Sequence, residues 1–266
     1  MPNPSQNFES LLEQARTHST LMMPEGWGQG RATFGGLVAA VLYAHMEQQV
    51  EASRLPRSLS LSFVGPVAPG PVELETEILR EGRGVTQAQS RLRQNGQVQA
   101  VMLGSFGASR PSQIQVDAEP APSVKAPEHC VKRPTVPGLT PEFMQWFDYR
   151  WGVGTLPYMG SPHREMGGWV RFTEAPPRLG AAHLLALVDA WPPAVLPRLT
   201  KPAPASSLSW TLEFIHPLPE LDPQDWLLYV ASIDQAREGY GQTQARLWSA
   251  KGELVALSRQ TVTVFD

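Results

Sequence analysis

Cysteine is almost absent from this sequence of 266 residues, in which Cys130 is the single thiol. One cysteine cannot build an internal disulfide framework, and a free thiol is typical of a reducing compartment. Long apolar runs are also missing: none reaches the roughly 18 residues of a transmembrane helix, and residues 1–21 lack the charged-then-apolar pattern of a secretion signal. We therefore expect a cytoplasmic protein without membrane insertion.

The sequence also lacks a large excess of either positive or negative charge. The 22 Lys and Arg residues are balanced by 25 Asp and Glu, and the formal net charge is -3. Such a chain has no general attraction for nucleic acid or for an anionic membrane, so we expect no nucleic-acid partner. With 42% hydrophobic and 18% charged residues, the chain has room for two compact domains and a substantial core.

Several enzyme motifs are missing too. The sequence has no G-x-S-x-G nucleophile elbow, no P-loop and no G-x-G-x-x-G pattern. Its six histidines are scattered, and none stands at the spacing of metal ligands. We predict neither a metal site nor a cofactor.

What the sequence does contain is one structural pattern stated twice. The first copy opens at Gly35 and Gly36 and continues through residues 37–44, which are almost all apolar and predict a helix buried on every side. Strands with period-two alternation follow, and an Asn95-Gly96 pair predicts a hairpin between the last two. These predicted strands are residues 59–63, 72–78, 87–93 and 98–106.

The second copy repeats this order and spacing. Residues 181–188 predict another apolar helix, which Pro192 and Pro193 end. The strands predicted after it are residues 207–215, 226–233, 242–248 and 253–265. A buried helix followed by antiparallel strands fits a sheet curled around a central helix, so we predict an α+β fold in which two such domains pack as a pseudo-dimer.

A proline-rich segment separates the copies. Residues 109–141 show little periodicity and predict an extended linker across the surface. The predicted N-terminal domain is then residues 1–108, and the C-terminal domain is residues 142–266.

Asp189 and Gln260 are the candidate catalytic residues. Asp189 follows a fully apolar run on the second helix, where a carboxylate must be hydrogen-bonded, paired or kept near water. In a cleft beside apolar surface its pKa would rise, as a general base requires; the alternative is a frayed, solvated helix end. Gln260 shares the inward parity of Val262 and Val264, and it either positions a carboxylate and a water or satisfies a buried backbone group.

Ser207 and the glycine pair are weaker candidates. Parity places Ser207 on the polar side of its strand, and only a strand-end position or a β-bulge would turn its hydroxyl inward. Gly35 and Gly36 would let a substrate carbonyl approach backbone N–H groups at the positive end of the first helix, which makes an oxyanion site. The alternative is that these glycines only permit close packing of the helix.

Motifs in both copies resemble the double hot-dog acyl-CoA thioesterases, a family that includes bacterial acyl-CoA thioesterase II. The motifs are Thr33-Phe34-Gly35-Gly36-Leu37-Val38, Leu187-Val188-Asp189 followed by Pro192-Pro193, Phe214-Ile215-His216-Pro217, and Leu254-Val255-Ala256 leading to Gln260. The resemblance implies a double hot-dog fold and hydrolysis of a small-molecule acyl-CoA to free acid and coenzyme A. It also implies a homo-oligomer, a dimer of double hot-dogs.

The family's site implies a role for each candidate. An aspartate, a threonine and a glutamine hold the attacking water in that family, and Asp189 and Gln260 match two of them by residue type. Ser207 stands at the threonine position, where it keeps the hydroxyl and loses the methyl group that restricts the rotamer. The first copy has no equivalent set, because the positions opposite Asp189, Ser207 and Gln260 are Ala44, Pro56 and Gly104.

Other functions on the same fold stay open. One is a catalytically silent protein that binds acyl-CoA or an acyl chain. Another is an enoyl-CoA hydratase, although the run from Asp189 to Pro193 lacks the histidine that such an enzyme pairs with its aspartate. Within a thioesterase, direct attack by Asp189 to form an anhydride is an alternative to general-base catalysis.

Overall fold

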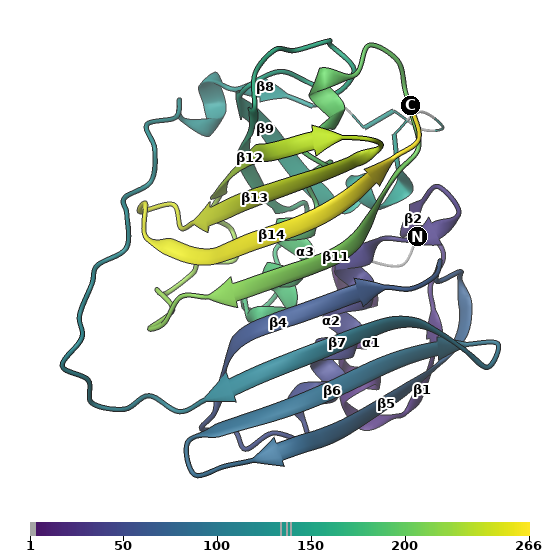
Figure 1. Cartoon of the computed structure of the whole chain (residues 1–266), viewed down its shortest axis with the longest axis vertical. Helices are drawn as coiled ribbons and strands as arrows, with labels where there is room; N and C mark the ends of the chain where they lie inside the picture. Colours follow the sequence, from purple (N-terminus) through teal and green to yellow (C-terminus); the bar gives the residue numbers. More distant parts are fainter. Residues whose placement is uncertain (1–3, 134, 137, 139) are drawn as a thin grey trace.

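One continuous antiparallel sheet carries both halves of the chain (Figure 1). The computed structural model describes residues 4–133, 135–136, 138 and 140–266. Its first half contributes, in spatial order, β1 (Thr20–Met23), β5 (Gly70–Glu81), β6 (Val85–Gln94), β7 (Gln97–Gly107) and β4 (Leu55–Phe63). The second half continues the sheet with β11 (Ala205–Phe214), β14 (Leu254–Val264), β13 (Tyr240–Trp248), β12 (Leu227–Arg237), β10 (Glu165–Phe172), β9 (Phe147–Val153) and β8 (Val131–Lys132). The pairing of β4 with β11 joins the two halves.

The two halves repeat each other down to their irregularities. Three breaks in strand register in the first half have counterparts at corresponding places in the second half. They fall at Pro56/Ser58 and Ser207/Ser209, at Ile78/Arg80 and Ile233/Gln235, and at Leu92/Arg93 and Leu247/Trp248. The internal repeat predicted from the sequence therefore holds at the level of single β-bulges.

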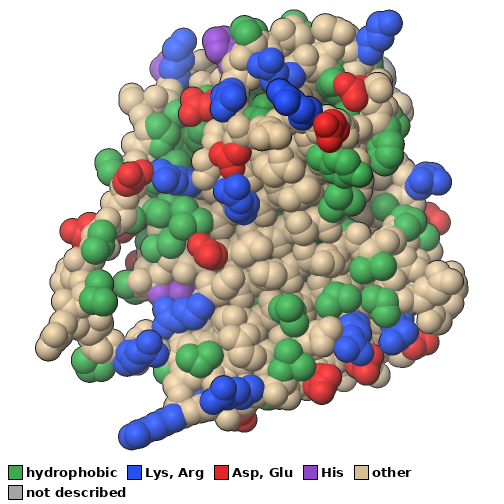
Figure 2. Space-filling view, in the orientation of Figure 1, with side chains coloured by type: hydrophobic (Ala, Val, Ile, Leu, Met, Phe, Trp, Pro, Cys, Tyr) green, Lys and Arg blue, Asp and Glu red, His purple; other side chains and the backbone are tan. Residues whose placement is uncertain are grey.

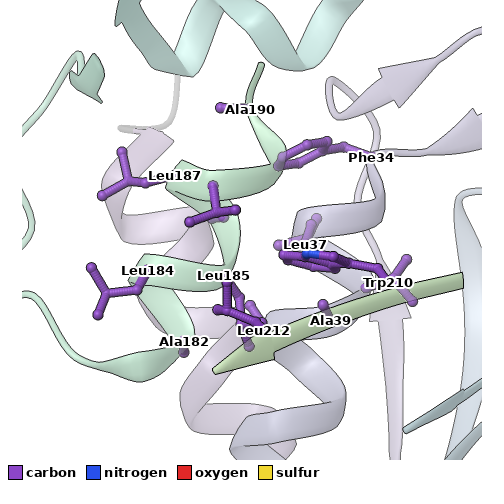
Figure 3. Close-up of a cluster of buried hydrophobic side chains, with 14 of the residues drawn as sticks. Phe34, Leu37, Ala39, Ala182, Leu184, Leu185, Leu187, Ala190, Trp210 and Leu212 are labelled. Atoms are coloured by element: carbon purple, nitrogen blue, oxygen red, sulfur yellow. The ribbon is translucent and has the colours of Figure 1, made fainter. Parts of the chain in front are cut away.

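Two buried helices lie side by side against the sheet. α2 (Gly35–Glu47) and α3 (Ala181–Asp189) contain the two apolar runs, and nearly all of their side chains are buried. Figure 3 shows Leu37 of α2 and Leu185 of α3 beside Trp210 and Leu212 of β11. Burial of each large apolar side chain contributes about 1.5–3 kcal/mol, so this layer is the core that fixes the two helices against each other.

A third helix, α1 (Pro4–Thr17), covers the helix pair. No helix is predicted for this segment from the sequence, although Phe8, Leu11, Leu12 and Ala15 are buried at helical spacing. Arg16 of α1 forms an ion pair with Glu47 of α2 at 3.1 Å. The short strands β2 (Gly28–Gln29) and β3 (Ala32–Thr33) form a separate hairpin that leads into α2.

Part of the predicted linker joins the sheet of the second half. From β7 it passes along one side of the molecule to the far edge of the sheet (Figure 1). Its residues 127–132 form the short helix η1 (Pro127–His129) and then β8, which pairs with β9. Residues 134, 137 and 139 of the linker lie outside the described part of the chain. Further helical turns are η2 (Glu142–Trp146) and η3 (Leu196–Arg198).

The outer face of the sheet shows charged side chains of both signs scattered among uncharged ones (Figure 2). Within the described residues, no helix combines the length and the apolar character needed to cross a bilayer. No group of three or more His, Cys, Asp and Glu side chains in that part of the chain is arranged to hold a metal ion.

Candidate functional site

The C-terminal end of α3 meets the N-terminal end of α2. Asp189 is the last residue of α3, and its carboxylate accepts a hydrogen bond from the backbone N–H of Gly36 in the first turn of α2. A Cβ atom on Gly35 would stand only 2.9 Å from Asp189 Oδ2, so the glycine leaves room for the carboxylate. The helices are therefore antiparallel, and the positive end of the α2 dipole faces the Asp189 anion.

Gln260 binds the same carboxylate from the sheet. It lies on β14 opposite Trp210 of β11, and its Nε2 donates a hydrogen bond to Asp189 Oδ1 at 3.0 Å. Of the two roles considered for an inward glutamine, this geometry corresponds to a partner for the carboxylate. Asp189 thus has donors from two elements, the start of α2 and the centre of β14.

The Asp189 carboxyl has a pKa near neutrality. Burial raises the pKa to about 7, and the hydrogen bonds from Gln260 and Gly36 oppose that rise because they favour the anion. The residue keeps part of its surface exposed at the end of its helix. A carboxylate with this pKa can accept a proton from water and release it again near pH 7.

Ser207 faces the inner side of the sheet because of a β-bulge. The register between β11 and β14 shifts between Ser207 and Ser209, which pair with Val262 and Thr261. Val262 is fully buried, so its partner Ser207 shares the inner face, next to the position of Gln260. Simple alternation places Ser207 on the outer face, and the inserted residue reverses that expectation. In the described contacts, the Ser207 hydroxyl has no hydrogen bond to Asp189 or Gln260.

Aromatic side chains surround the end of α3, and most of them are not among the residues predicted from the sequence. The Trp191 ring stacks on the Tyr229 ring, with 5.3 Å between ring centroids, and its centroid lies 4.9 Å from that of Trp151. The Tyr149 hydroxyl donates to the carbonyl oxygen of Ala190 at 2.9 Å and so fixes the turn after Asp189. Burial, with the nearby Asp189 charge, raises the pKa of Tyr149 and Tyr229, and both phenols stay protonated.

The corresponding place in the first half has no carboxylate. The first residues of the two helices are Gly35 and Ala181, and aligning them puts Tyr43, rather than the expected Ala44, opposite Asp189. Gly104 pairs with Leu59 on β4 as Gln260 pairs with Trp210 on β11. The expected counterpart Pro56 lies at the matching bulge. This set has no counterpart of the Asp189 carboxylate and its glutamine partner.

The two histidines on the central helices have structural partners. His183 Nδ1 accepts a hydrogen bond from the backbone N–H of Gly180 at 3.1 Å, and its Nε2 contacts the Glu9 carboxylate. His45 Nδ1 contacts the Thr76 hydroxyl at 2.7 Å. These bonds hold the first turn of α3 and the last turn of α2.

Two surface cavities lie away from Asp189. One, of about 700 Å³, is lined by residues of the β9–β10 loop and the ends of β12 and β13, including Thr155 and Asp234. The other, of about 420 Å³, is lined by Arg150, Arg171 and Trp226 among others. Neither is lined by Asp189 or Gln260, which are both partly exposed.

Two sequence families match the chain, one in each half. Residues 23–107 match the acyl-CoA thioesterase N-terminal domain, and residues 127–264 match the acyl-CoA thioesterase C-terminal domain. The chain belongs to the acyl-CoA thioesterase family. The second match contains Asp189, Ser207 and Gln260, and the first contains Gly35 and Gly36.

Solved structures share the fold of this acyl-CoA thioesterase family member over nearly its whole length. A putative thioesterase II from Thermobifida fusca is 23% identical, with a TM-score of 0.84 and 99% of each chain covered. A hot-dog protein of unknown function from Alicyclobacillus acidocaldarius is 24% identical, with a TM-score of 0.83, 96% of this chain and 98% of that one covered. Acyl-CoA thioesterase II TesB2 from Mycobacterium marinum is 19% identical, with a TM-score of 0.74 and the same coverage. The predicted double hot-dog α+β fold is confirmed.

A search among curated proteins finds no match to this chain.

Proposed function

We propose that this protein hydrolyses the thioester of an acyl-CoA to a free acid and coenzyme A. The observation that carries the proposal is the Asp189 carboxylate, which has a pKa of about 7 and is held by Gln260 and by the start of α2. Membership of the acyl-CoA thioesterase family supports the same reaction. A neutral-pH base beside a helix N-terminus is suited to the addition of water to a carbonyl group.

In the proposed mechanism, Asp189 removes a proton from a water molecule as the water oxygen bonds to the thioester carbon. The carbonyl electrons move onto oxygen and return as the carbon–sulfur bond breaks. The leaving thiolate, whose conjugate thiol has a pKa of about 8.5, needs little acid assistance. The proton on Asp189 then passes to the thiolate or to solvent, and the free carboxylate is restored.

The other residues orient the reactants. Gln260 holds Asp189 Oδ1 and, with Ser207 on the same inner face, orients the water. The Gly36 N–H already donates to Asp189, which differs from the oxyanion role expected for it. We therefore assign Gly36 to the base, and we assign the oxyanion contact to the Gly35 N–H at the open end of α2.

Single-turnover hydrolysis in ¹⁸O-labelled water tests water attack against the anhydride route. Direct attack by water places the label in the released acid and none in the protein. Label found in the Asp189 side chain after one turnover would show an anhydride intermediate instead.

Release of free thiol from a panel of acyl-CoAs tests the proposal as a whole. We expect hydrolysis of at least one of the short, long or aromatic acyl-CoAs, with turnover proportional to the protein concentration. The competing function is a silent acyl-CoA binding protein. Saturable binding of an acyl-CoA without hydrolysis of any panel member would favour it.

The pH dependence of hydrolysis follows from the Asp189 pKa of about 7. The base must be ionised to accept a proton, so we expect kcat/KM to rise about tenfold per pH unit below that pKa and to level off above it. Rates measured from pH 5 to 9 with a stable acyl-CoA check this. A rate that is flat from pH 5 to 7 would contradict a base with a raised pKa.

Gln260→Met should change both the plateau and the midpoint of the curve of kcat/KM against pH. Its amide hydrogen bond lowers the pKa of Asp189, so its loss moves the midpoint to higher pH, and loss of water orientation lowers the plateau by about 10²-fold. Gln244→Met is the matched control, since this glutamine lies on the outer face and contacts Asp234. A lower plateau without a shifted midpoint would separate water orientation from tuning of the base.

The assembly and the compartment remain predictions. We expect a homo-oligomer, a dimer of double hot-dogs, in the cytoplasm. Light scattering coupled to size-exclusion chromatography measures the first, and fractionation of the source cells measures the second.

A further inference from the structure

Hydrogen-bond donors without partners gather beside the end of α3. Trp151 Nε1, Trp191 Nε1 and Arg133 Nη1 are all buried and have no partner in the described structure. An unmade hydrogen bond of a buried donor costs about 1–3 kcal/mol. Four other buried groups among the described residues also lack a partner, namely Trp27 Nε1, Trp248 Nε1, Thr33 Oγ1 and Thr155 Oγ1, but none of them lies in the Arg133–Trp151–Trp191 chain of ring contacts. Three in one place indicate that something else accepts from them.

Trp151 lies between the other two side chains and contacts both. The Arg133 guanidinium lies over the Trp151 ring, 5.9 Å from its centre, and the Trp151 and Trp191 rings are 4.9 Å apart. Trp151 and Trp191 are only 5% and 4% exposed. They come from the end of β8, from β9 and from the turn after α3, so the fold brings these donors together.

Arg133 carries a positive charge that nothing in the described protein neutralises. None of the ion pairs among the described residues includes it, and burial lowers its pKa. The Asp189 carboxylate instead takes its hydrogen bonds from Gln260 and Gly36. Arg133 is partly buried, and a partly desolvated charge without a counter-ion favours binding of an anion.

Other arginines of this half do not share the feature. Arg150 and Arg171 stack on Trp226, but Arg150 donates to the Tyr149 carbonyl oxygen, and Arg171 donates to Gln224 and pairs with Asp148. Their guanidinium groups are structural supports on the outer face. Arg133 is different because its guanidinium lies over the Trp151 ring and its buried Nη1 lacks an acceptor in the described structure.

We propose that Arg133, Trp151 and Trp191 bind the far end of the acyl group, and that this end is a carboxylate. The substrate would then be the CoA thioester of a short dicarboxylic acid. A guanidinium and two indole N–H groups match a carboxylate, which accepts several hydrogen bonds and carries one negative charge. Trp191 follows Asp189 by two residues, at most about 7.6 Å between Cα atoms, so a short acyl group spans the interval. This inference rests on the proposed thioesterase function.

The test compares acyl-CoAs of equal length with different ends. We expect adipoyl-CoA to have a kcat/KM at least about 10-fold above hexanoyl-CoA, and glutaryl-CoA to exceed pentanoyl-CoA likewise. Arg133→Met should lower the adipoyl-CoA value by about 10- to 100-fold, as expected for loss of a charged hydrogen bond, and leave the hexanoyl-CoA value within about threefold. Arg246→Met, at an exposed arginine paired with Glu119, is the control.

A second, more conservative variant distinguishes loss of binding from a folding defect. Trp191→Phe keeps an aromatic ring and removes the N–H, so it should lower the adipoyl-CoA kcat/KM by about 5- to 10-fold and spare hexanoyl-CoA. Equal losses on both substrates in both variants would overturn the carboxylate subsite and indicate a packing role. A wild-type protein that prefers hexanoyl-CoA would overturn it as well, with ordered water then satisfying the donors.

Binding separates this inference from the proposed function. Calorimetry with adipoyl-CoA and hexanoyl-CoA on Asp189→Asn measures recognition without turnover. Tighter binding of adipoyl-CoA that Arg133→Met abolishes, in a protein that hydrolyses neither compound, would retain the subsite and reject the hydrolase. Hydrolysis without preference between the two ends would retain the hydrolase and reject the subsite. Neither binding nor hydrolysis would reject both.

Discussion

Replacing Asp189 with asparagine is expected to lower kcat for acyl-CoA hydrolysis by about 10³-fold, in line with the loss of a general base. Asparagine keeps the size of the side chain and one carbonyl oxygen that can accept from Gln260, so the packing of the helix ends should survive. Thiol release at pH 8 measures the change. Full activity in Asp189→Asn would show that the reaction is carried elsewhere.

The same substitution should stabilise the protein at alkaline pH. The Asp189 pKa is about 7 in the folded protein, against an ordinary value of 3.8 for an aspartate side chain, so between these pH values the folded state binds more protons than the unfolded state. Stability due to this group is therefore present at acidic pH and is lost as pH rises through about 7. A neutral asparagine side chain at this position would avoid the loss, which is on the order of a few kcal/mol at pH 8.

Thermal melts at pH 5 and pH 8 measure that gain. The melting temperature of Asp189→Asn should exceed that of the wild type at pH 8, and the excess should shrink at pH 5. Asp234→Asn, at a carboxylate that pairs with Arg259 on the surface, serves as the control and should show no such gain. An Asp189→Asn protein that melts lower at both pH values would contradict the buried, destabilised carboxylate.

Gly36→Ala is expected to have the second largest effect, because it acts on stability and on the base together. A Cβ atom there would stand 2.5 Å from Phe34 Cζ and 3.1 Å from Ala186 Cα. The Phe34 ring cannot move freely, since it stacks on Phe143 at 4.2 Å. We expect a loss of about 1–3 kcal/mol in the free energy of unfolding, as for other overpacked cores.

The hydrolytic activity of Gly36→Ala should fall together with its stability. Separation of α2 from α3 would pull the Gly36 N–H away from Asp189, which removes a bond that favours the anion. The pH midpoint should move upward, and kcat should fall by about 10-fold or more. Gly180→Ala is the control, because a Cβ there meets only His183 Nδ1, at 3.9 Å. If both variants unfold at the same denaturant concentration, the close contact at Gly36 does not determine the stability of the protein.

The central helices and the hairpins could be predicted from the sequence because local pattern determines them. Two runs apolar on every side became α2 and α3, which are buried in the core. The Asn95-Gly96 pair adopts positive φ angles of 53° and 75° and turns β6 into β7, as its residue types require. Asp189 and Gln260 were identified as candidates because a polar residue on an apolar surface is conspicuous.

Features that depend on pairing between distant segments could not be predicted. Alternation along β11 gives the wrong face for Ser207, since a bulge is defined by the partner strand and leaves no mark in its own sequence. The contact of Arg133 with Trp151 likewise needs β8 to pair with β9. The α1 helix is different, because Phe8, Leu11, Leu12 and Ala15 carry a readable helical spacing.

The proposed site is shared by the two halves of one chain: Gly35 and Gly36 come from the first half, and Asp189 and Gln260 come from the second. Two identical copies joined about a twofold axis would contain this arrangement twice, and any substitution would alter both places at once. Tandem fusion removes that constraint. The first copy keeps the glycines that face its neighbour, while Tyr43 and Gly104 occupy its own corresponding place. On the proposed function, the polypeptide would have one catalytic site, and the second position would be free to change for packing alone.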